Sequence, residues 1–237
     1  MIFTLPFTVA SSETDINGIC RFSALMRHLQ DAAFGQTETY GPNEATLRRL
    51  HAAFMVIRFA GCLYAPLYRG DVLTTETFGT YSRGFSYGRD YRILRKEETV
   101  FEASSVWALA DTDKRKPFRV GEIAMGFDED PPLSFCPPRL TLPKQDMMTF
   151  LTSHRVSYSE ADGNRHLNNT VYPDMFCDAL DMENKRISFF SVNYVSEAPL
   201  GTVLALYGKS EGDTTFFRAN KEDGRLCTEA QITLTSL

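Results

Sequence analysis

A short polar motif occurs twice in the chain, and this recurrence restricts the fold more than any other feature. Residues 12–17 read SETDIN and residues 159–164 read SEADGN, so both copies have the pattern S-E-x-D-x-N at a separation of 147 residues. Further along, residues 70–73 (GDVL) parallel residues 201–204 (GTVL) at a separation of 131 residues. A duplicated structural unit is the simplest explanation of both recurrences.

Each copy is predicted to contain a strand, a polar segment, a helix and a series of strands. Residues 3–12 alternate between apolar and polar side chains, which is typical of a strand. From Arg21 the apolar residues recur at helical spacing, and Gly41-Pro42 ends that helix. Residues 55–110 then form strand-like segments rich in β-branched and aromatic side chains. The chain therefore belongs to the α+β class.

The second copy repeats this succession after a proline-rich stretch. A strand is predicted over residues 153–159 and a helix over about residues 170–181, followed by four strand-like runs. Residues 131–150 lack a sustained period and contain five prolines, which do not supply ladder hydrogen bonds. We predict an N-terminal unit over residues 1–130, a linker over 131–150 and a C-terminal unit over 151–237.

Bulk properties exclude several classes of function. The net charge of −5 argues against nonspecific nucleic-acid binding. The five cysteines are scattered and form no C-x-x-C pair, so neither a disulfide framework, a zinc site nor another metal or cofactor site is expected, and a reducing cytoplasm is the default location. No apolar run approaches the roughly 20 residues of a membrane-spanning helix, and no signal peptide is predicted.

The polar segment of the second copy concentrates groups that can orient, deprotonate and hydrogen-bond. Asp162, Asn164 and His166 occupy alternate positions, whereas the first copy has Ile19 at the position of His166. Asx turns and helix capping are the alternative roles for the aspartate and the asparagine. Because Pro173 fits only in the first turn of a helix, the helix is predicted to begin near Asn169 or Thr170 and to offer backbone N–H groups to an oxyanion.

A second motif, Gly84-Phe85-Ser86-Tyr87-Gly88, has the G-x-S-x-G form of a hydrolase nucleophile elbow. Such an elbow requires a strand before the serine and a helix after it. Here strand-like sequence both enters and leaves, so the motif is predicted to be a hairpin turn.

The segment from Asp162 to Asn169, followed by Tyr172, resembles the D-x-N-x-H-x-N-N-x-x-Y segment of the acyl-ACP thioesterases of plants and bacteria. The run Tyr194-Val195-Ser196-Glu197 is similar to their Y-x-x-E element. First-half segments that are also similar to the family are residues 25–33, 69–72, 88–91 and 103–109. Plant members commonly have cysteine after that glutamate, and here the residue is Ala198, which puts a cysteine nucleophile in doubt.

The resemblance implies a double hotdog fold, in which each of two tandem units wraps an antiparallel sheet around a long helix. It implies hydrolysis of fatty acyl-ACP, with Asp162, Asn164, His166 and Glu197 as the catalytic set and either carboxylate as the base or a direct nucleophile. The N-terminal unit is then expected to bind the acyl chain through Leu25, Met26 and Leu29. The alternatives are acyl-CoA hydrolysis, another hotdog thioester reaction, and a noncatalytic acyl-binding module.

The implied partner is acyl carrier protein, which is acidic, so a local basic patch is expected to attract it. The two candidate patches are the group Lys114, Arg115, Lys116 and Arg119 and the pair Arg48 and Arg49. The resemblance is also compatible with a homodimer.

Overall fold

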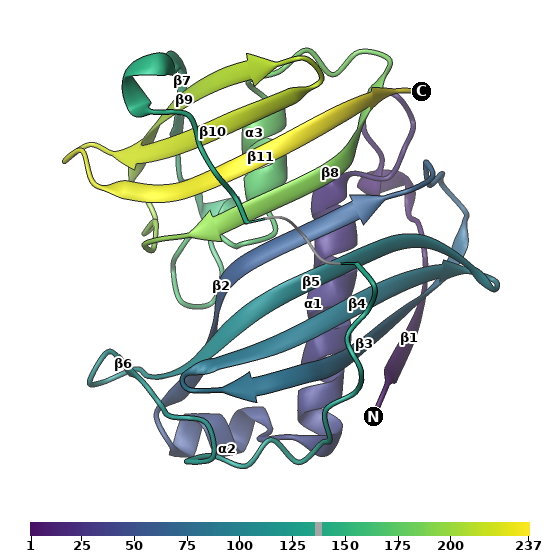
Figure 1. Ribbon diagram of the computed structural model, residues 1–237, viewed down its shortest axis with the longest axis vertical. Coiled ribbons are helices and arrows are strands. Elements are labelled where there is room, and N and C mark those ends of the chain that lie inside the picture. Colours follow the sequence, from purple (N-terminus) through teal and green to yellow (C-terminus); the bar gives the residue numbers. More distant parts are fainter. Residues whose placement is uncertain (136–138) are drawn as a thin grey trace. The chain divides into compact units, whose positions relative to one another are not determined.

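The computed structural model describes residues 1–135 and 139–237, and its two compact units are interleaved along the chain (Figure 1). Unit 1 comprises residues 1–9, 27–65 and 70–137, and unit 2 comprises residues 10–26, 66–69 and 138–237. The sequence predicted two units, each an uninterrupted stretch of chain, on either side of a linker at residues 131–150. In the structure, residues 10–26 and 66–69 of the first half group with the second half. Cys136, Pro137 and Pro138 of the expected linker lie outside the described residues.

Unit 1 contains an antiparallel sheet in the order β1-β3-β4-β5-β2. The bounds of these strands are Phe3–Thr8 (β1), Ala52–Leu63 (β2), Val72–Arg83 (β3), Ser86–Arg95 (β4) and Glu98–Asp111 (β5). The two-residue strand β6 (Lys116–Pro117) pairs with the end of β5. As predicted from the turn sequence, Ser86 of the G-x-S-x-G motif pairs with Arg83 across the β3–β4 hairpin, so no helix follows it.

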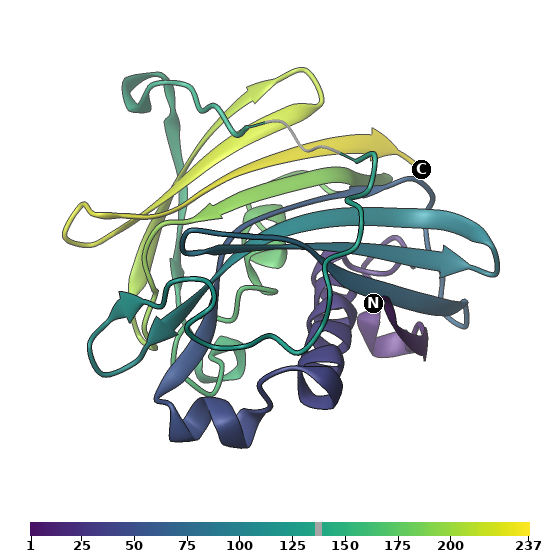
Figure 2. The same cartoon turned by 60° about the horizontal axis from the view of Figure 1, so that its bottom comes forward.

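Helix α1 spans Phe22–Tyr40, and its residues from Arg27 onward belong to unit 1 together with the sheet (Figure 2). The short helix α2 (Glu44–Arg49) follows. The apolar stripe that predicted α1 is buried: its members Leu25, Leu29, Ala32 and Ala33 are at most 9 % exposed. Gln36 continues this stripe and accepts a hydrogen bond from the buried Arg89 of β4. Burial of this stripe stabilises the helix far more than its intrinsic propensity does.

Unit 2 contains an antiparallel sheet in the order β8-β11-β10-β9-β7. Its strands are Thr149–Arg155 (β7), Lys185–Tyr194 (β8), Val203–Glu211 (β9), Thr214–Lys221 (β10) and Leu226–Ser236 (β11). Strand β7 starts four residues earlier than the predicted 153–159 because Thr149 and Phe150 already pair with β9.

Helix α3 spans only Tyr172–Cys177, which corrects the predicted helix over 170–181. Asn168 accounts for the later start, since its side-chain oxygen accepts from Thr170 N at 2.9 Å and its carbonyl accepts from Val171 N at 2.9 Å. The helix is held by aromatic packing: Phe176 is fully buried and its ring lies 4.7 Å from that of Phe217 on β10. The polar segment before α3 is therefore a hydrogen-bonded loop.

Candidate active site

The two copies of the recurring motif fold into the same loop. In the C-terminal loop (residues 161–167), Asp162 Oδ1 accepts hydrogen bonds from the backbone N–H groups of Asn164 at 2.8 Å and His166 at 3.1 Å. In the N-terminal loop (residues 14–20), Asp15 Oδ1 accepts from residues 17 and 19 at 2.8 and 3.2 Å. A β-bridge closes each loop, between Thr14 and Cys20 and between Ala161 and Leu167. Both aspartates therefore shape their loop.

One histidine and one glutamate distinguish the C-terminal loop from its counterpart. His166 Nε2 lies 3.5 Å from Glu197 Oε2, and the two side chains are 28 % and 46 % exposed. The bridge between His166 and Pro199 brings Glu197 to the loop, and Leu167 N donates to Ala198 O at 2.8 Å. The same backbone bond joins Cys20 N to Leu67 O in the first copy, so the positions of His166 and Glu197 are occupied there by Ile19 and Pro66.

The two asparagines of the duplicated motif have different environments. The Asn17 side chain is half-buried, donating to Met182 O at 2.7 Å and Lys185 O at 3.0 Å and accepting from Asn184 N at 3.0 Å. Asn164 is exposed beside His166, and its side-chain amide makes no hydrogen bond within residues 1–135 and 139–237. Asn17 thus anchors the segment before β8, while the Asn164 amide remains available to a ligand.

Four of the backbone N–H groups that follow His166 already donate hydrogen bonds within the protein, which leaves fewer of them for an oxyanion than the sequence predicted. Leu167 N donates to Ala198 O, Asn168 N to Glu160 O, and Thr170 and Val171 N to Asn168. In addition α3 begins at Tyr172, six residues beyond His166, and is only six residues long. The side chains of Asn164 and His166 in the same loop are further candidate hydrogen-bond donors for an oxyanion.

Tyrosines of the motif hold the end of the loop. Tyr194 OH donates to Asn169 O at 2.9 Å, and its ring packs edge-on against Tyr172 at 5.3 Å. Burial raises the pKa of both phenols, so they stay protonated at neutral pH. These side chains act as hydrogen-bonded supports.

Cysteine chemistry at this site is disfavoured by burial. Ala198, which follows Glu197, is 1 % exposed and carries no thiol. Burial, with Asp174 and Asp178 nearby, raises the pKa of the Cys177 thiol, which suppresses the nucleophilic thiolate. Burial also raises the pKa of Cys227, whose sulfur donates to Ser196 O at 3.1 Å.

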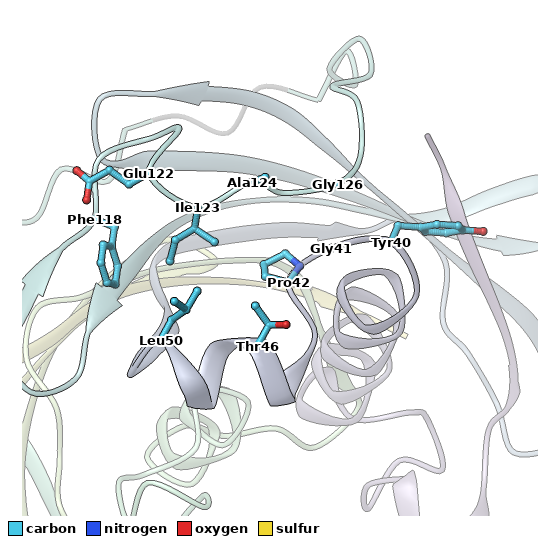
Figure 3. Close-up of a pocket in the computed structure, with 10 residues that line it drawn as sticks. All are labelled: Tyr40, Gly41, Pro42, Thr46, Leu50, Phe118, Glu122, Ile123, Ala124 and Gly126. Carbon is cyan, nitrogen blue, oxygen red and sulfur yellow. The ribbon is translucent and has the colours of Figure 1, made fainter.

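The predicted acyl-binding residues are packed inside the protein. Leu25, Met26 and Leu29 are 0, 6 and 2 % exposed. A pocket of about 500 Å³ lies elsewhere, at the end of α1 and along α2 (Figure 3). Its lining residues are Tyr40, Gly41, Pro42, Thr46, Leu50, Phe118, Glu122, Ile123, Ala124 and Gly126. The role of the three α1 residues in binding an acyl chain stays a prediction.

The two candidate basic patches lie at one end of unit 1. His51, just after α2, pairs with Asp113 at 3.0 Å, and its carbonyl accepts from Thr112 N at 2.7 Å. The turn that carries Lys114, Arg115 and Lys116 is thereby joined to the helix that carries Arg48 and Arg49. Acidic neighbours reduce the charge, since Lys114 pairs with Asp111 at 3.0 Å and Arg48 pairs with Glu44.

Family models match both halves of the chain. Residues 1–125 match the acyl-ACP thioesterase N-terminal domain, and residues 144–235 match the acyl-ACP thioesterase C-terminal domain. The chain belongs to the acyl-ACP thioesterase family. The predicted α+β tandem hotdog fold and the assignment as a thioester hydrolase are thereby confirmed. Comparison with curated protein sequences gives no significant match.

Solved structures share this thioesterase fold over nearly the whole chain. An acyl-ACP thioesterase from Bacteroides thetaiotaomicron is 22 % identical with a TM-score of 0.87, covering 99 % of this chain and 98 % of that one. A 12:0-ACP thioesterase from Umbellularia californica is 18 % identical with a TM-score of 0.87, covering 100 % and 98 %. A putative oleoyl thioesterase from Lactobacillus plantarum is 16 % identical with a TM-score of 0.83, covering 100 % and 97 %.

Within the described parts of the thioesterase, no helix combines the length and the hydropathy required to cross a bilayer.

Proposed function

We propose that the chain hydrolyses fatty acyl-ACP to free fatty acid and holo-ACP at the site formed by His166, Glu197, Asn164 and Asp162. The observation that carries this proposal is the His166–Glu197 pair at 3.5 Å, which stands where the otherwise matching N-terminal loop has isoleucine and proline. Ile19 and Pro66 occupy these two positions in the first copy, so packing of the loop does not require a histidine and a carboxylate there. The presence of this pair is explained by proton transfer.

In the proposed mechanism Glu197 acts as general base toward water. The water oxygen attacks the thioester carbonyl carbon while its proton passes to the carboxylate, and the tetrahedral intermediate then loses the thiolate as the C–S bond breaks. The proton taken up by Glu197 passes to His166, 3.5 Å away, and His166 delivers it to sulfur. The thiolate needs little further help because an ordinary thiol has a pKa of about 8.5. Asn164 and His166 donate hydrogen bonds to the oxyanion, a role in which amide and imidazole side chains are effective.

Asp162 is the alternative base, and a direct attack by its carboxylate to give a mixed anhydride is a further alternative. Glu197 is favoured because Oδ1 of Asp162 is committed to two backbone N–H groups, an arrangement that Asp15 reproduces in a loop without the histidine. Asp162 then acts by holding Asn164 and His166 in place.

Matched substitutions at the two carboxylates test this assignment. Glu197→Gln is expected to lower kcat by about 10²-fold or more, the usual value of a general base. Asp162→Asn keeps an oxygen that can accept both backbone bonds, so its kcat is expected to fall by less than about tenfold. Ser86→Ala serves as the control and should retain activity because Ser86 lies in a hairpin. The opposite ranking of the two carboxylate variants would assign the base to Asp162.

The same assay decides between carriers. Acyl-ACP and acyl-CoA of equal chain length are compared by kcat/KM, and a preference for acyl-CoA would replace the carrier in the proposal. An inactive parent enzyme that nevertheless binds acyl-ACP would favour the noncatalytic acyl-binding module. We place the reaction in the reducing cytoplasm because the five cysteines are scattered along the sequence and form no C-x-x-C pair. Sedimentation velocity of the same preparation distinguishes a monomer from a homodimer.

A further inference from the structure

A second histidine–glutamate pair lies at the entrance to the C-terminal loop. His154 is on β7, and its Nε2 lies 3.1 Å from Glu160 Oε1 and 3.2 Å from Oε2. Both side chains are largely buried, at 19 % and 21 % exposed. A histidine–carboxylate hydrogen bond that is partly shielded from water is stronger than one at the surface.

Glu160 joins three separate parts of unit 2. Its carboxylate accepts from Ser157 N at 2.7 Å, which caps the short 3₁₀ helix Tyr158–Glu160, and it also contacts His154 on β7. Its carbonyl accepts from Asn168 N at 2.9 Å, immediately after the loop closes. A displacement of Glu160 would therefore move both ends of the loop that carries Asn164 and His166.

The first copy repeats the two backbone contacts of Glu160. Glu13 accepts from Ala10 N at 2.7 Å through its carboxylate and from Arg21 N at 2.8 Å through its carbonyl, which reproduces the bonds of Glu160. The position of His154 is occupied there by Phe7, 147 residues earlier, whose ring stacks on His28 at 3.8 Å. The phenylalanine side chain has no N–H donor, so the strand before the N-terminal loop has no counterpart of the His154 imidazole.

The C-terminal copy thus has histidine at two positions that are apolar in the N-terminal copy, His154 for Phe7 and His166 for Ile19. We propose that His154 and Glu160 are positioning residues, which hold the C-terminal loop so that His166 and Asn164 keep their orientation toward the thioester. This inference rests on the proposed function and deepens it. Positioning of this kind is valuable because a shift of about 1 Å in a catalytic group can cost about 10²-fold in rate.

The test compares Glu160→Gln, His154→Phe and their double variant with the parent enzyme. Glutamine also serves in a capping box, so Glu160→Gln keeps the cap while removing the charge. The matched control is Glu13→Gln, the same change in the N-terminal copy. His154→Gln is the rescue variant because its amide can donate to Glu160 from a similar position. Hydrogen exchange of residues 161–169 and 14–20 provides a readout that needs no substrate.

We expect each single C-terminal variant to lower kcat by about 10- to 100-fold with KM changed by less than about threefold. The double variant should be no slower than the worse single variant, since the two residues act through one contact. His154→Gln should recover activity, Glu13→Gln should match the parent, and exchange should rise in residues 161–169 only.

Unchanged kcat and exchange in Glu160→Gln would overturn the inference, and so would additive losses in the double variant. A loss of kcat shared by Glu13→Gln would show that the pair has only a structural role. If His154→Phe fails to fold, the comparison of Glu160→Gln with Glu13→Gln still tests the positioning role. A parent enzyme that hydrolyses no thioester would refute the proposed function, whereas the exchange measurement would still report on the coupling.

Discussion

At the scale of single residues, comparison of the two loops shows which residues they need in common to form. Asp15 and Asp162 make the same backbone bonds, and Gly18 and Arg165 share a positive φ of 74° and 65°. A left-handed backbone is costly for a residue with a Cβ, so the loop conformation is imposed by its hydrogen bonds. What differs between the copies, above all His166, is what we propose takes part in the chemistry.

The asparagine pair gives the sharpest residue-level prediction. Asn17→Ala should lower the free energy of unfolding by about 1–3 kcal/mol, because Met182 O, Lys185 O and Asn184 N each lose a hydrogen bond to the Asn17 side chain. Asn164→Ala should leave stability nearly unchanged and lower kcat by about 10²–10³-fold, the range for removing an oxyanion donor. Chemical denaturation and steady-state kinetics measure the two effects. Equal behaviour of both variants would contradict the division of roles.

At the scale of elements, short connections carry the surface features of unit 1. The G-x-S-x-G motif lies in the β3–β4 hairpin, whose turn is formed by Gly84 and Phe85. Gly84 has a φ of 66° and occupies the first central position, where a type II′ turn favours glycine. The β5–β6 turn and α2 bring two basic groups to one end of the unit. An acidic carrier protein approaching that end would meet both groups together.

We expect Arg115→Glu to raise the KM for acyl-ACP and to weaken its dependence on ionic strength, while leaving a short pantetheine thioester nearly unaffected. Reversing Lys114 as well is less informative, because Lys114 hydrogen-bonds Asp111 and its loss would disturb the turn. Lys96→Glu is the control: Lys96 is also exposed with a positive φ, but it precedes β5 whereas Arg115 follows it. Equal effects of the two reversals would refute a local docking surface.

At the scale of the whole molecule, the two halves have diverged from a common plan. Each half contributes five long antiparallel strands within the described residues, and the first half adds the two-residue strand β6, but α1 has 19 residues and α3 has six. The C-terminal loop has the histidine–glutamate pairs His166–Glu197 and His154–Glu160, and the first copy has Ile19 and Phe7 at the two histidine positions. We therefore retain the proposal that the first half shapes the acyl-chain site and the second half performs the chemistry.

Chain-length preference tests this division of labour. Leu25→Ala or Leu29→Ala is expected to shift the preferred acyl length by changing kcat/KM between substrates by about 10- to 200-fold, which corresponds to the ~1–3 kcal/mol of a methylene-scale change. The cavity will also lower stability by about 2–5 kcal/mol, so Leu→Met is the conservative companion variant. A series of acyl-ACP substrates measures the shift. Slower turnover with an unchanged preference would argue against an acyl-binding role.

The sequence by itself determined the features that depend on local pattern. The duplication, the α1 stripe, the hairpin at Ser86 and the polar loop around His166 are encoded in neighbouring residues, so spacing and turn chemistry predict them. The family resemblance identified Glu197 by motif order, although its distance from His166 depends on the bridge to Pro199.

Only the tertiary structure decided the features that depend on contacts between distant residues. Leu167 N donates to Ala198 O, and Asn17 has a partner 165 residues away, whereas the Asn164 side chain is exposed. The pairing of His154 with Glu160 also became visible only in the structure. Periodicity reports which face of an element is buried, whereas hydrogen-bond partners follow from how the chain returns on itself.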